Sequence, residues 1–174
     1  ATVRKGLAMG AARAIHIADP ALAGADLGLT AEALAAALRA EGADLVITGN
    51  QSTDGSGGVM ASWLGELLQL PVAPNLATVE ITESGVSGDR PIDGAATRIS
   101  VPLPAVISIT EALPDARFPN FKGIMAAKKK PFEQRTLADL GVNAEDPAAA
   151  RSIMLTVAAK PPREAGIKIV DEGD

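Results

Sequence analysis

A glycine-rich segment between an apolar run and a helical pattern constrains this chain more than any other feature. Residues 44–48 (Asp-Leu-Val-Ile-Thr) form a continuous apolar run of strand length, typical of a parallel strand covered on both faces. The glycine-rich segment spans residues 49–58, and a helix is predicted from Val59 to Leu70, where Pro71 ends it. In open α/β sheets, ligands bind beyond the carboxyl ends of such strands. The segment therefore predicts a ligand site on an α/β fold.

The elements before this segment extend the same alternation. Residues 1–9 indicate the end of an amphipathic helix that stops at Gly10, and residues 14–17 indicate a short buried strand. A second helix is predicted from an N-cap at Thr30 to Glu41, with Gly42 as its stop. The order helix, strand, helix, strand, loop, helix predicts a doubly wound domain with a mostly parallel sheet. The chain begins at Ala1 within a helical pattern and without Met, so we expect an N-terminal portion to be absent.

The second half of the chain has a different pattern, of short strands followed by a loop and a tail. Four short strands, expected at residues 77–81, 85–87, 97–101 and 104–109, would add partly antiparallel strands to the sheet. Residues 111–131 predict a Pro- and Lys-rich loop with one short helical turn, and the chain beyond Leu140 predicts an extended tail. We therefore expect one α/β domain over residues 1–140 and a tail over residues 141–174.

The glycine-rich segment has the composition of a phosphate-binding loop. Its glycines allow backbone N–H groups to approach an anion, and the following helix N-terminus adds partial positive charge. Neither GxGxxG nor GxxxxGK[ST] is present, and residues 49–58 contain no Lys. These residues therefore favour a single phosphate over a triphosphate that is hydrolysed. A flexible connection with a good N-cap is an equally acceptable reading of the composition.

Composition excludes several other functions. A net charge of −5 and an aromatic content of 2% argue against nucleic-acid binding. With no Cys and one His, a transition-metal site is improbable, and His16 is expected to be structural. No GxSxG motif or comparable catalytic arrangement is present, and no apolar run reaches the ~20 residues of a membrane span. We therefore predict no catalytic residues, no metal site and no membrane span.

A basic segment with aromatic residues follows the predicted strands. Residues 117–130 place Phe118, Phe121 and Met125 within eight positions, flanked by Arg and Lys. An apolar anchor inside a ring of cations is suited to an acidic partner surface. The alternative is that the lysines form a solvated face and the phenylalanines belong to the core.

At these motifs the chain resembles the β (small) subunit of electron-transfer flavoprotein. The resemblance rests on the basic segment 117–130, on residues 90–94 followed by 103–108, and on the strand and loop at 44–55. Residues 6–11 and 139–142 fit further family elements, so the resemblance spans nearly the whole chain. It implies an adenine-nucleotide α-hydrolase-like (Rossmann-like) fold. The family's usual N-terminal strand, helix and second strand are absent here.

The resemblance also implies cofactors and partners. It implies a heterodimer in which a larger α subunit holds most of a redox-active FAD, AMP bound structurally, a tail packed on the α subunit, and a cytoplasmic bacterial setting. The complex accepts electrons from dehydrogenases, such as acyl-CoA dehydrogenases in fatty acid oxidation, and passes them to the respiratory chain. By position, the nucleotide site comprises Leu45, Val46, Gly49, Asn50, Gln51, Ser52, Thr53, Asp54, Gly55, Ser56, Gly57, Gly58 and Val59. The partner-docking residues are Arg117, Phe121 (the hydrophobic anchor), Met125, Lys128, Lys129 and Lys130.

Alternatives remain open at this stage. Some family members bind a second FAD in place of AMP and bifurcate electrons, and the short glycine-rich loop is compatible with either ligand. From a different class, the chain could be an ATP-hydrolysing or nucleotide-sensing domain of the same fold. The absence of a Lys or Arg in the loop weighs against ATP hydrolysis.

Overall fold

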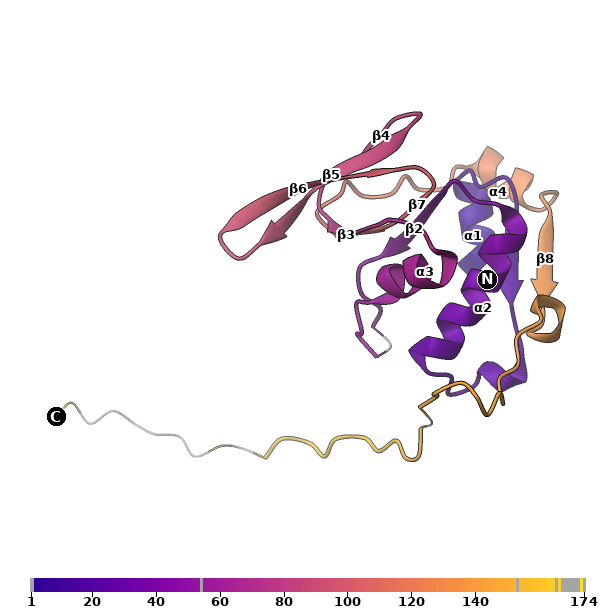
Figure 1. The fold of residues 1–174 in the computed structure, drawn as a ribbon, viewed down its shortest axis with the longest axis vertical. Helices are drawn as coiled ribbons and strands as arrows, with labels where there is room; N and C mark the ends of the chain where they lie inside the picture. Colours follow the sequence, from indigo (N-terminus) through magenta and orange to yellow (C-terminus); the bar gives the residue numbers. More distant parts are fainter. Residues whose placement is uncertain (1, 54, 153, 165, 167–172, 174) are drawn as a thin grey trace.

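Two groups of elements make up the chain in a computed structural model, which describes residues 2–53, 55–152, 154–164, 166 and 173 (Figure 1). The larger group contains a parallel sheet, two helices and an antiparallel sheet. The smaller group contains two helices on a two-stranded parallel sheet.

The central sheet has three parallel strands in the order β2-β7-β3, with bounds Leu45–Gly49, Ala105–Ile109 and Val72–Leu76. Its register pairs Val46 with Val106 and Val72 with Val106. Helices α2 (Leu27–Glu41) and α3 (Met60–Leu68) pack on one face. The buried cluster there consists of Ala35, Val46, Ala61, Leu64 and Val106. Since α2 precedes β2 and α3 follows it, both helix N-termini lie near the carboxyl end of β2.

The other face of the central sheet is covered by an antiparallel sheet of strands β4 (Glu80–Ile81), β5 (Gly85–Ile92) and β6 (Ala95–Pro102). Ala73, Leu76, Val86 and Ile107 form a second buried cluster between the two sheets. A side chain at Gly88 would meet the Thr78 carbonyl oxygen, because a Cβ there would lie 2.0 Å from it. The close approach of these strands therefore depends on a missing side chain.

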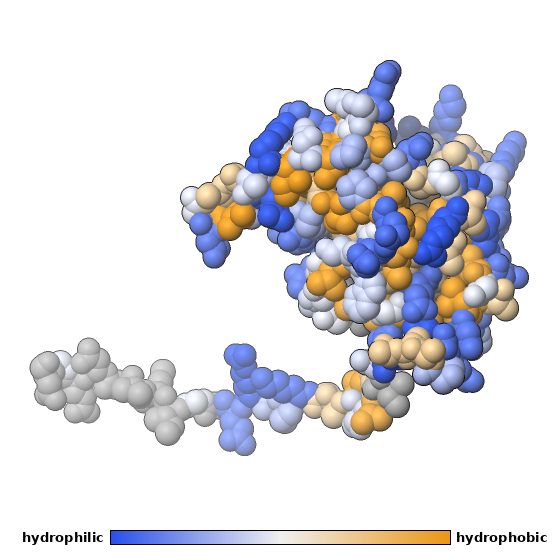
Figure 2. Space-filling view, in the orientation of Figure 1, coloured by the Kyte–Doolittle hydropathy of each residue, from blue (hydrophilic) through white to orange (hydrophobic). Residues whose placement is uncertain are grey.

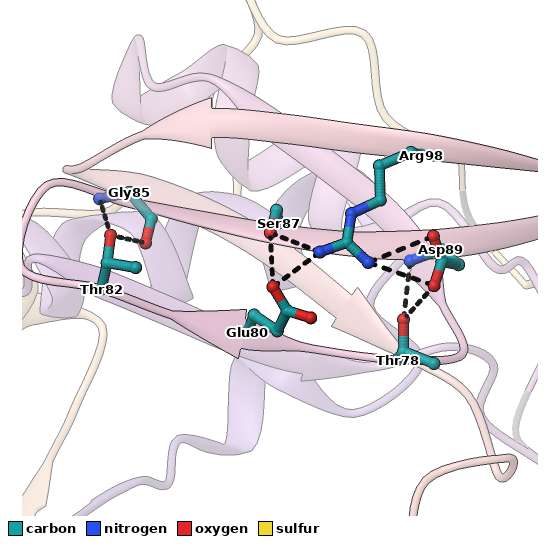
Figure 3. A network of polar contacts seen from close by, with 7 residues as sticks. All are labelled: Thr78, Glu80, Thr82, Gly85, Ser87, Asp89 and Arg98. Atoms are coloured by element: carbon teal, nitrogen blue, oxygen red, sulfur yellow. Dashed lines mark hydrogen bonds and ion pairs between the residues drawn. The ribbon is translucent and has the colours of Figure 1, made fainter.

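The outer face of the antiparallel sheet carries a polar network around Arg98 (Figure 3). Arg98 Nη2 donates to Glu80 Oε2 at 2.6 Å, and Arg98 Nη1 donates to Asp89 Oδ2 at 3.2 Å. Thr78 Oγ1 donates to the same Asp89 oxygen at 2.8 Å. The Thr78 hydroxyl, followed by Arg98, holds the pKa of Asp89 below its ordinary value. These contacts connect three segments on the solvent side of the sheet.

The smaller group pairs β1 (Ala14–Ile17) with β8 (Phe132–Arg135) in parallel. Helix α1 (Thr2–Met9) packs against β1 and against α4 (Phe121–Ala127). Short 3-10 helices η1 (Pro20–Leu22) and η2 (Ala138–Leu140) follow β1 and β8. Segments that are more than one hundred residues apart in sequence thus meet at α1 and α4.

The predicted fold class is confirmed: the chain is mixed α/β, with mostly parallel strands and additional antiparallel strands. The antiparallel strands were expected to extend the parallel sheet, but they form a sheet of their own that packs on its face. The predicted N-cap of α2 is wrong, since Asp26 is the cap and Thr30 lies within the first helical turn. Strands β3 and β8 were not predicted. Strand β1 was expected to be buried but has no fully buried residue, and β2 is not covered on both faces, since Ile47 is 52% exposed. The short helical turn expected within residues 111–131 is α4.

The part of the chain after Leu140 contains no helix or strand among its described residues. Residues 154–164 extend away from the body, and we call them the C-terminal arm (Figure 1). In the space-filling view most of the arm stands clear of the body, which shows orange apolar surface interrupted by blue hydrophilic side chains (Figure 2). The arm begins against the body, since Met154 Cε lies 3.5 Å from where a Cβ on Gly24 would stand. Leu155 and Val157 in the arm are 84% and 78% exposed. None of the described helices combines the length and apolar character needed to cross a membrane.

Candidate functional site

A cavity of about 540 Å³ lies at the carboxyl end of β2, beside the glycine-rich loop. This volume falls within the roughly 300–1,000 Å³ of typical small-ligand sites. The described residues on its wall come from β2, the loop and the first turns of α2 and α3: Ala25, Asp26, Leu27, Thr30, Thr48, Gly49, Asn50, Gln51, Ser52, Gly55, Gly57, Gly58 and Met60. Sequence reasoning placed a ligand at this edge of the sheet, and the cavity lies there.

The two helix N-termini at the cavity differ in how their N–H groups are satisfied. Asp26 caps α2, and its Oδ1 accepts from the Leu29 N–H at 2.8 Å. Val59 is the N-cap residue of α3, and its apolar side chain makes no hydrogen bond to the helix. The first turn of α3 therefore has backbone donors available to an anion, and the first turn of α2 already faces a carboxylate.

The backbone of the loop takes conformations that suit glycine. Gly55 and Gly58 have φ values of 70° and 65°, and Ser56 between them has a φ of 49°. Gln51 Nε2 donates to the Ser56 carbonyl oxygen at 2.6 Å and braces the turn. An added Cβ at Gly57 would lie 2.8 Å from Leu27 Cδ1, so the loop rests on the first turn of α2. The loop thus closes the cavity through its backbone.

Asp26 connects the cavity to the start of the tail. Its Oδ2 accepts from the Ser152 N–H at 2.7 Å, and Arg151 forms an ion pair with Glu32 at 2.7 Å. The N–H groups of Leu29 and then Ser152, together with the nearby Arg151 charge, lower the pKa of Asp26. Asp26 is therefore a carboxylate at neutral pH.

Several residues predicted for the nucleotide site lie on the cavity wall. They are Gly49, Asn50, Gln51, Ser52, Gly55, Gly57 and Gly58. Leu45 and Val46 pack into the hydrophobic clusters beneath the cavity because they precede the end of the strand. Thr53, Ser56 and Val59 are not on the wall, and Asp54 lies outside the described residues.

Sequence reasoning missed the contribution of α2 to the cavity. Asp26, Leu27 and Thr30 reach it from a segment that precedes β2 in the chain. Thr48 lies inside the predicted stretch 45–59, and Met60 directly follows it. The available signal was Asp26 followed by a helical pattern, because Asp is a strong N-cap residue. Gly28 within the first turn obscured it.

A second candidate site lies on the outer surface of α4 and the loop before it. Phe118 is 90% exposed and Phe121 is 80% exposed. Met125 is 47% exposed, and Arg117 is also exposed. We call this set, with Lys128 and Lys129, the docking surface. Large exposed phenylalanines beside cations are unusual on a protein surface without a partner.

The three consecutive lysines have different environments. Lys128 and Lys129 are exposed. Lys130 turns inward, and its Nζ donates to the carbonyl oxygens of Leu7 at 2.9 Å and Ala11 at 2.6 Å. The structure therefore places Lys130, predicted as a docking residue, in a cap at the C-terminal end of α1.

Helix α1 supports and enlarges the docking surface. An added Cβ at Gly123 would lie 2.3 Å from the Ala8 carbonyl oxygen, so α4 packs tightly on α1. Lys5 of α1 borders two shallow cavities of about 370 Å³ each, beside Phe118 and beside Ile124. Asn120 caps α4 by accepting from the Gly123 N–H at 2.7 Å. Lys5 was not predicted, because its neighbours there are more than one hundred residues away in sequence.

The next features to consider are a metal site and the single histidine, His16. No cluster of three or more His, Asp or Glu suited to a metal ion occurs there. His16 is exposed on β1, and its ring centroid lies 6.3 Å from that of Phe132. The arrangement fits a surface ring contact.

Comparisons with known proteins show the family to which the chain belongs. Residues 1–140 match the family described as electron transfer flavoprotein domain. The chain is 45% identical over 175 aligned residues to a Mycobacterium leprae (strain TN) protein named "Electron transfer flavoprotein subunit beta", covering 99% of this chain and 66% of that protein. A protein of the same name from Syntrophomonas wolfei is 34% identical over 170 residues, which cover 98% of this chain and 64% of the relative. The one from Bacillus subtilis (strain 168) is 36% identical over 103 residues, which cover 59% and 40%. The chain thus spans 66% or less of the length of these relatives.

Proposed function

We propose, from the premise that this chain belongs to the electron transfer flavoprotein domain family, that it acts in a two-subunit electron carrier as the β subunit. The carrier would accept electrons from dehydrogenases, such as acyl-CoA dehydrogenases of fatty acid oxidation, and pass them to the respiratory chain. Relatives named as subunit beta cover nearly all of this chain and support this proposal. The setting proposed for it is the bacterial cytoplasm.

The observation that carries the proposal is the docking surface. Phe118 and Phe121 are almost fully exposed beside Arg117, Lys128 and Lys129. Aromatic anchors contribute affinity once they are buried in a partner, and cations increase the rate of encounter with an acidic surface. An electron carrier needs contacts of this kind, since it must bind its donor and release it in each cycle. We assign Phe121 as the main anchor, with Phe118 beside it.

In this proposal the chain has no catalytic residues of its own. A larger α subunit would hold most of the FAD, which supplies the redox chemistry of the complex. The C-terminal arm fits the role of a contact with that subunit, because Leu155 and Val157 are exposed and the arm makes no strand or helix with the body. Residues 141–174 would then pack on the partner, and residues 1–140 would form the nucleotide-binding domain.

The cavity beside the glycine-rich loop would hold AMP in a structural role. The backbone donors of the α3 first turn and the loop fit one phosphate group. Residues 49–58 have no Lys or Arg to neutralise a phosphate chain. A second FAD in place of AMP is the alternative occupant, as is expected for a bifurcating carrier.

The docking proposal is tested by Phe121→Ala in the complete two-subunit protein. The rate of flavin reduction by the donor dehydrogenase should fall at least ten-fold at limiting donor, with flavin and nucleotide content unchanged. Ile81→Ala is the matched control, because Ile81 is 57% exposed on β4, away from the docking surface. Equal rates of flavin reduction in the two variants would show that Phe121 does not contribute to docking.

The nucleotide proposal is tested by denaturing the purified complex and identifying the released nucleotides. One AMP and one FAD per complex are expected. Two FAD and no AMP would indicate a bifurcating carrier. ATP without flavin or a larger partner would contradict the electron carrier and favour an ATP-hydrolysing or nucleotide-sensing domain.

A further inference from the structure

The charge on the described lining of the nucleotide cavity is negative. Of the described residues on the cavity wall, Asp26 is the charged one. A neighbouring cavity of about 600 Å³ shares Ala25, Asp26 and Thr30 with it and is bordered further on by Ser152 and Met154. Asp26 again provides the charge among the described lining residues of that cavity. Any ligand that extends from the first cavity into the second passes this carboxylate.

The cations near Asp26 do not cancel its charge. Arg151 lies close enough to lower the pKa of Asp26, but its two terminal nitrogens, Nη1 and Nη2, donate to Glu32 at 3.2 and 2.7 Å. Asp146 also acts on Arg151. The Arg151 charge is therefore shared with Glu32 and Asp146, and Asp26 stays the charged group among the described residues that line the cavity.

The Asp26 carboxylate lies at the N-terminus of α2, a helix end that could otherwise bind an anion. Asp26 Oδ1 is 3.3 Å from where a Cβ on Gly28 would stand, and the Leu29 N–H is bonded to it. The N-terminus of α2 is thus satisfied by the Asp26 carboxylate, and no side chain among the described residues caps the N-terminus of α3. One phosphate has donors at α3, and a second phosphate that extends toward α2 meets Asp26.

We propose that Asp26 is a specificity-determining residue that restricts the cavity to nucleoside monophosphates by disfavouring a second phosphate. The inference rests on the proposed nucleotide site and names the residue that sets its selectivity. Selectivity by repulsion needs no contact with the preferred ligand, because the unfavourable contact is made by the competitor. Each added phosphate charge near a carboxylate costs on the order of 1 kcal/mol in a solvated site.

The test measures the affinities of AMP, ADP and ATP for the complete two-subunit protein after bound nucleotide has been removed. Asp26→Asn and Asp26→Ser both remove the charge and keep a side-chain oxygen for the cap, so the helix should remain stable. The ratio of the ATP to the AMP dissociation constant should fall by about five-fold or more in both variants. Glu83→Gln, at the exposed turn between β4 and β5, makes the same change in net charge away from the cavity and should leave the ratio unchanged.

Three results would overturn the inference in distinguishable ways. Equal affinities of the wild-type protein for AMP and ATP would show that the cavity is not selective, and the proposed nucleotide site would still stand. A ratio that is the same in Asp26→Asn, Asp26→Ser and wild type would assign the selectivity to other groups. Failure of all three nucleotides to bind, with the flavin still present, would overturn both the inference and the proposed nucleotide site.

Discussion

The proposed nucleotide cavity and the docking surface would bind their ligands by opposite means. The cavity is concave and is closed by backbone groups, with glycines at Gly55 and Gly58 where φ is positive. The docking surface consists of side chains, with Phe118 and Phe121 exposed beside lysines. A small anion is matched by N–H groups that are fixed by the fold. A protein partner is matched by apolar area and charge.

Gly123→Val should have the largest effect on stability, and its effect on binding should be limited to the docking surface. A side chain there would meet the Ala8 backbone carbonyl, so α4 must move away from α1, at a cost of about 2 kcal/mol or more. Urea unfolding should show the loss, and reduction by the donor should slow while nucleotide content is unchanged. The matched control is Gly6→Ala on α1, where an added Cβ meets nothing within 4 Å. A stable Gly123→Val protein would contradict the tight packing of α4.

The next largest effect separates the three lysines. Lys130→Met removes both bonds to the Leu7 and Ala11 carbonyl oxygens and should destabilise the chain by about 1–2 kcal/mol. Lys129→Met should leave the urea midpoint unchanged and should reduce the salt dependence of donor binding, because Lys129 is exposed. If both variants lose only donor binding, Lys130 belongs to the docking surface after all.

Gly58→Ala tests the backbone of the cavity. The φ of 65° at this position costs an L-residue about 1 kcal/mol, so AMP should bind roughly five-fold more weakly, as measured by calorimetry. Reduction by the donor dehydrogenase should be unaffected. For comparison, Gly49→Ala should be well tolerated by the fold, because an added Cβ there has open space and φ is not positive. Equal AMP affinities in wild type and Gly58→Ala would mean that the loop is not held by its backbone.

The smallest expected effect is the pH dependence contributed by Asp26. Its pKa is lower in the folded chain than in the unfolded chain, so its stabilising contribution is present above the unfolded pKa, about 3.9. The contribution is lost as pH falls through the lower folded value. Urea unfolding at pH 7 and at pH 3 should therefore show a larger deficit for Asp26→Asn at pH 7. A deficit that is the same at both pH values would contradict the lowered pKa.

The sequence predicted elements with local signals better than elements defined by distant partners. The apolar run of β2 and the stop at Gly42, which has a φ of 63°, could be read directly. Strand β3 contains Pro74, which argues against a strand, but it lies at the sheet edge and its register shifts between Ala73 and Leu76. Such an irregularity has no signature in a single sequence.

The same limit applies to the candidate sites. The glycine-rich loop and the basic segment 117–130 were found because their residue types are informative by themselves, and the choice of Phe121 as anchor came from the family resemblance. Asp26, Lys5 and the inward turn of Lys130 depend on the meeting of distant segments. Their roles could not be predicted without the fold that brings those segments together.

The inward turn of Lys130 has a consequence for how this stretch of sequence can change over generations. Three neighbouring codons specify the same amino acid, but substitution should be tolerated differently at each of them. At Lys128 and Lys129, exchange with Arg or a shift of the charge by one position preserves a positive face. At Lys130, a slender single-nitrogen donor fits between two carbonyl oxygens, and the broad planar head of Arg is a poor replacement. Drift among relatives should therefore be freer at the first two positions than at the third.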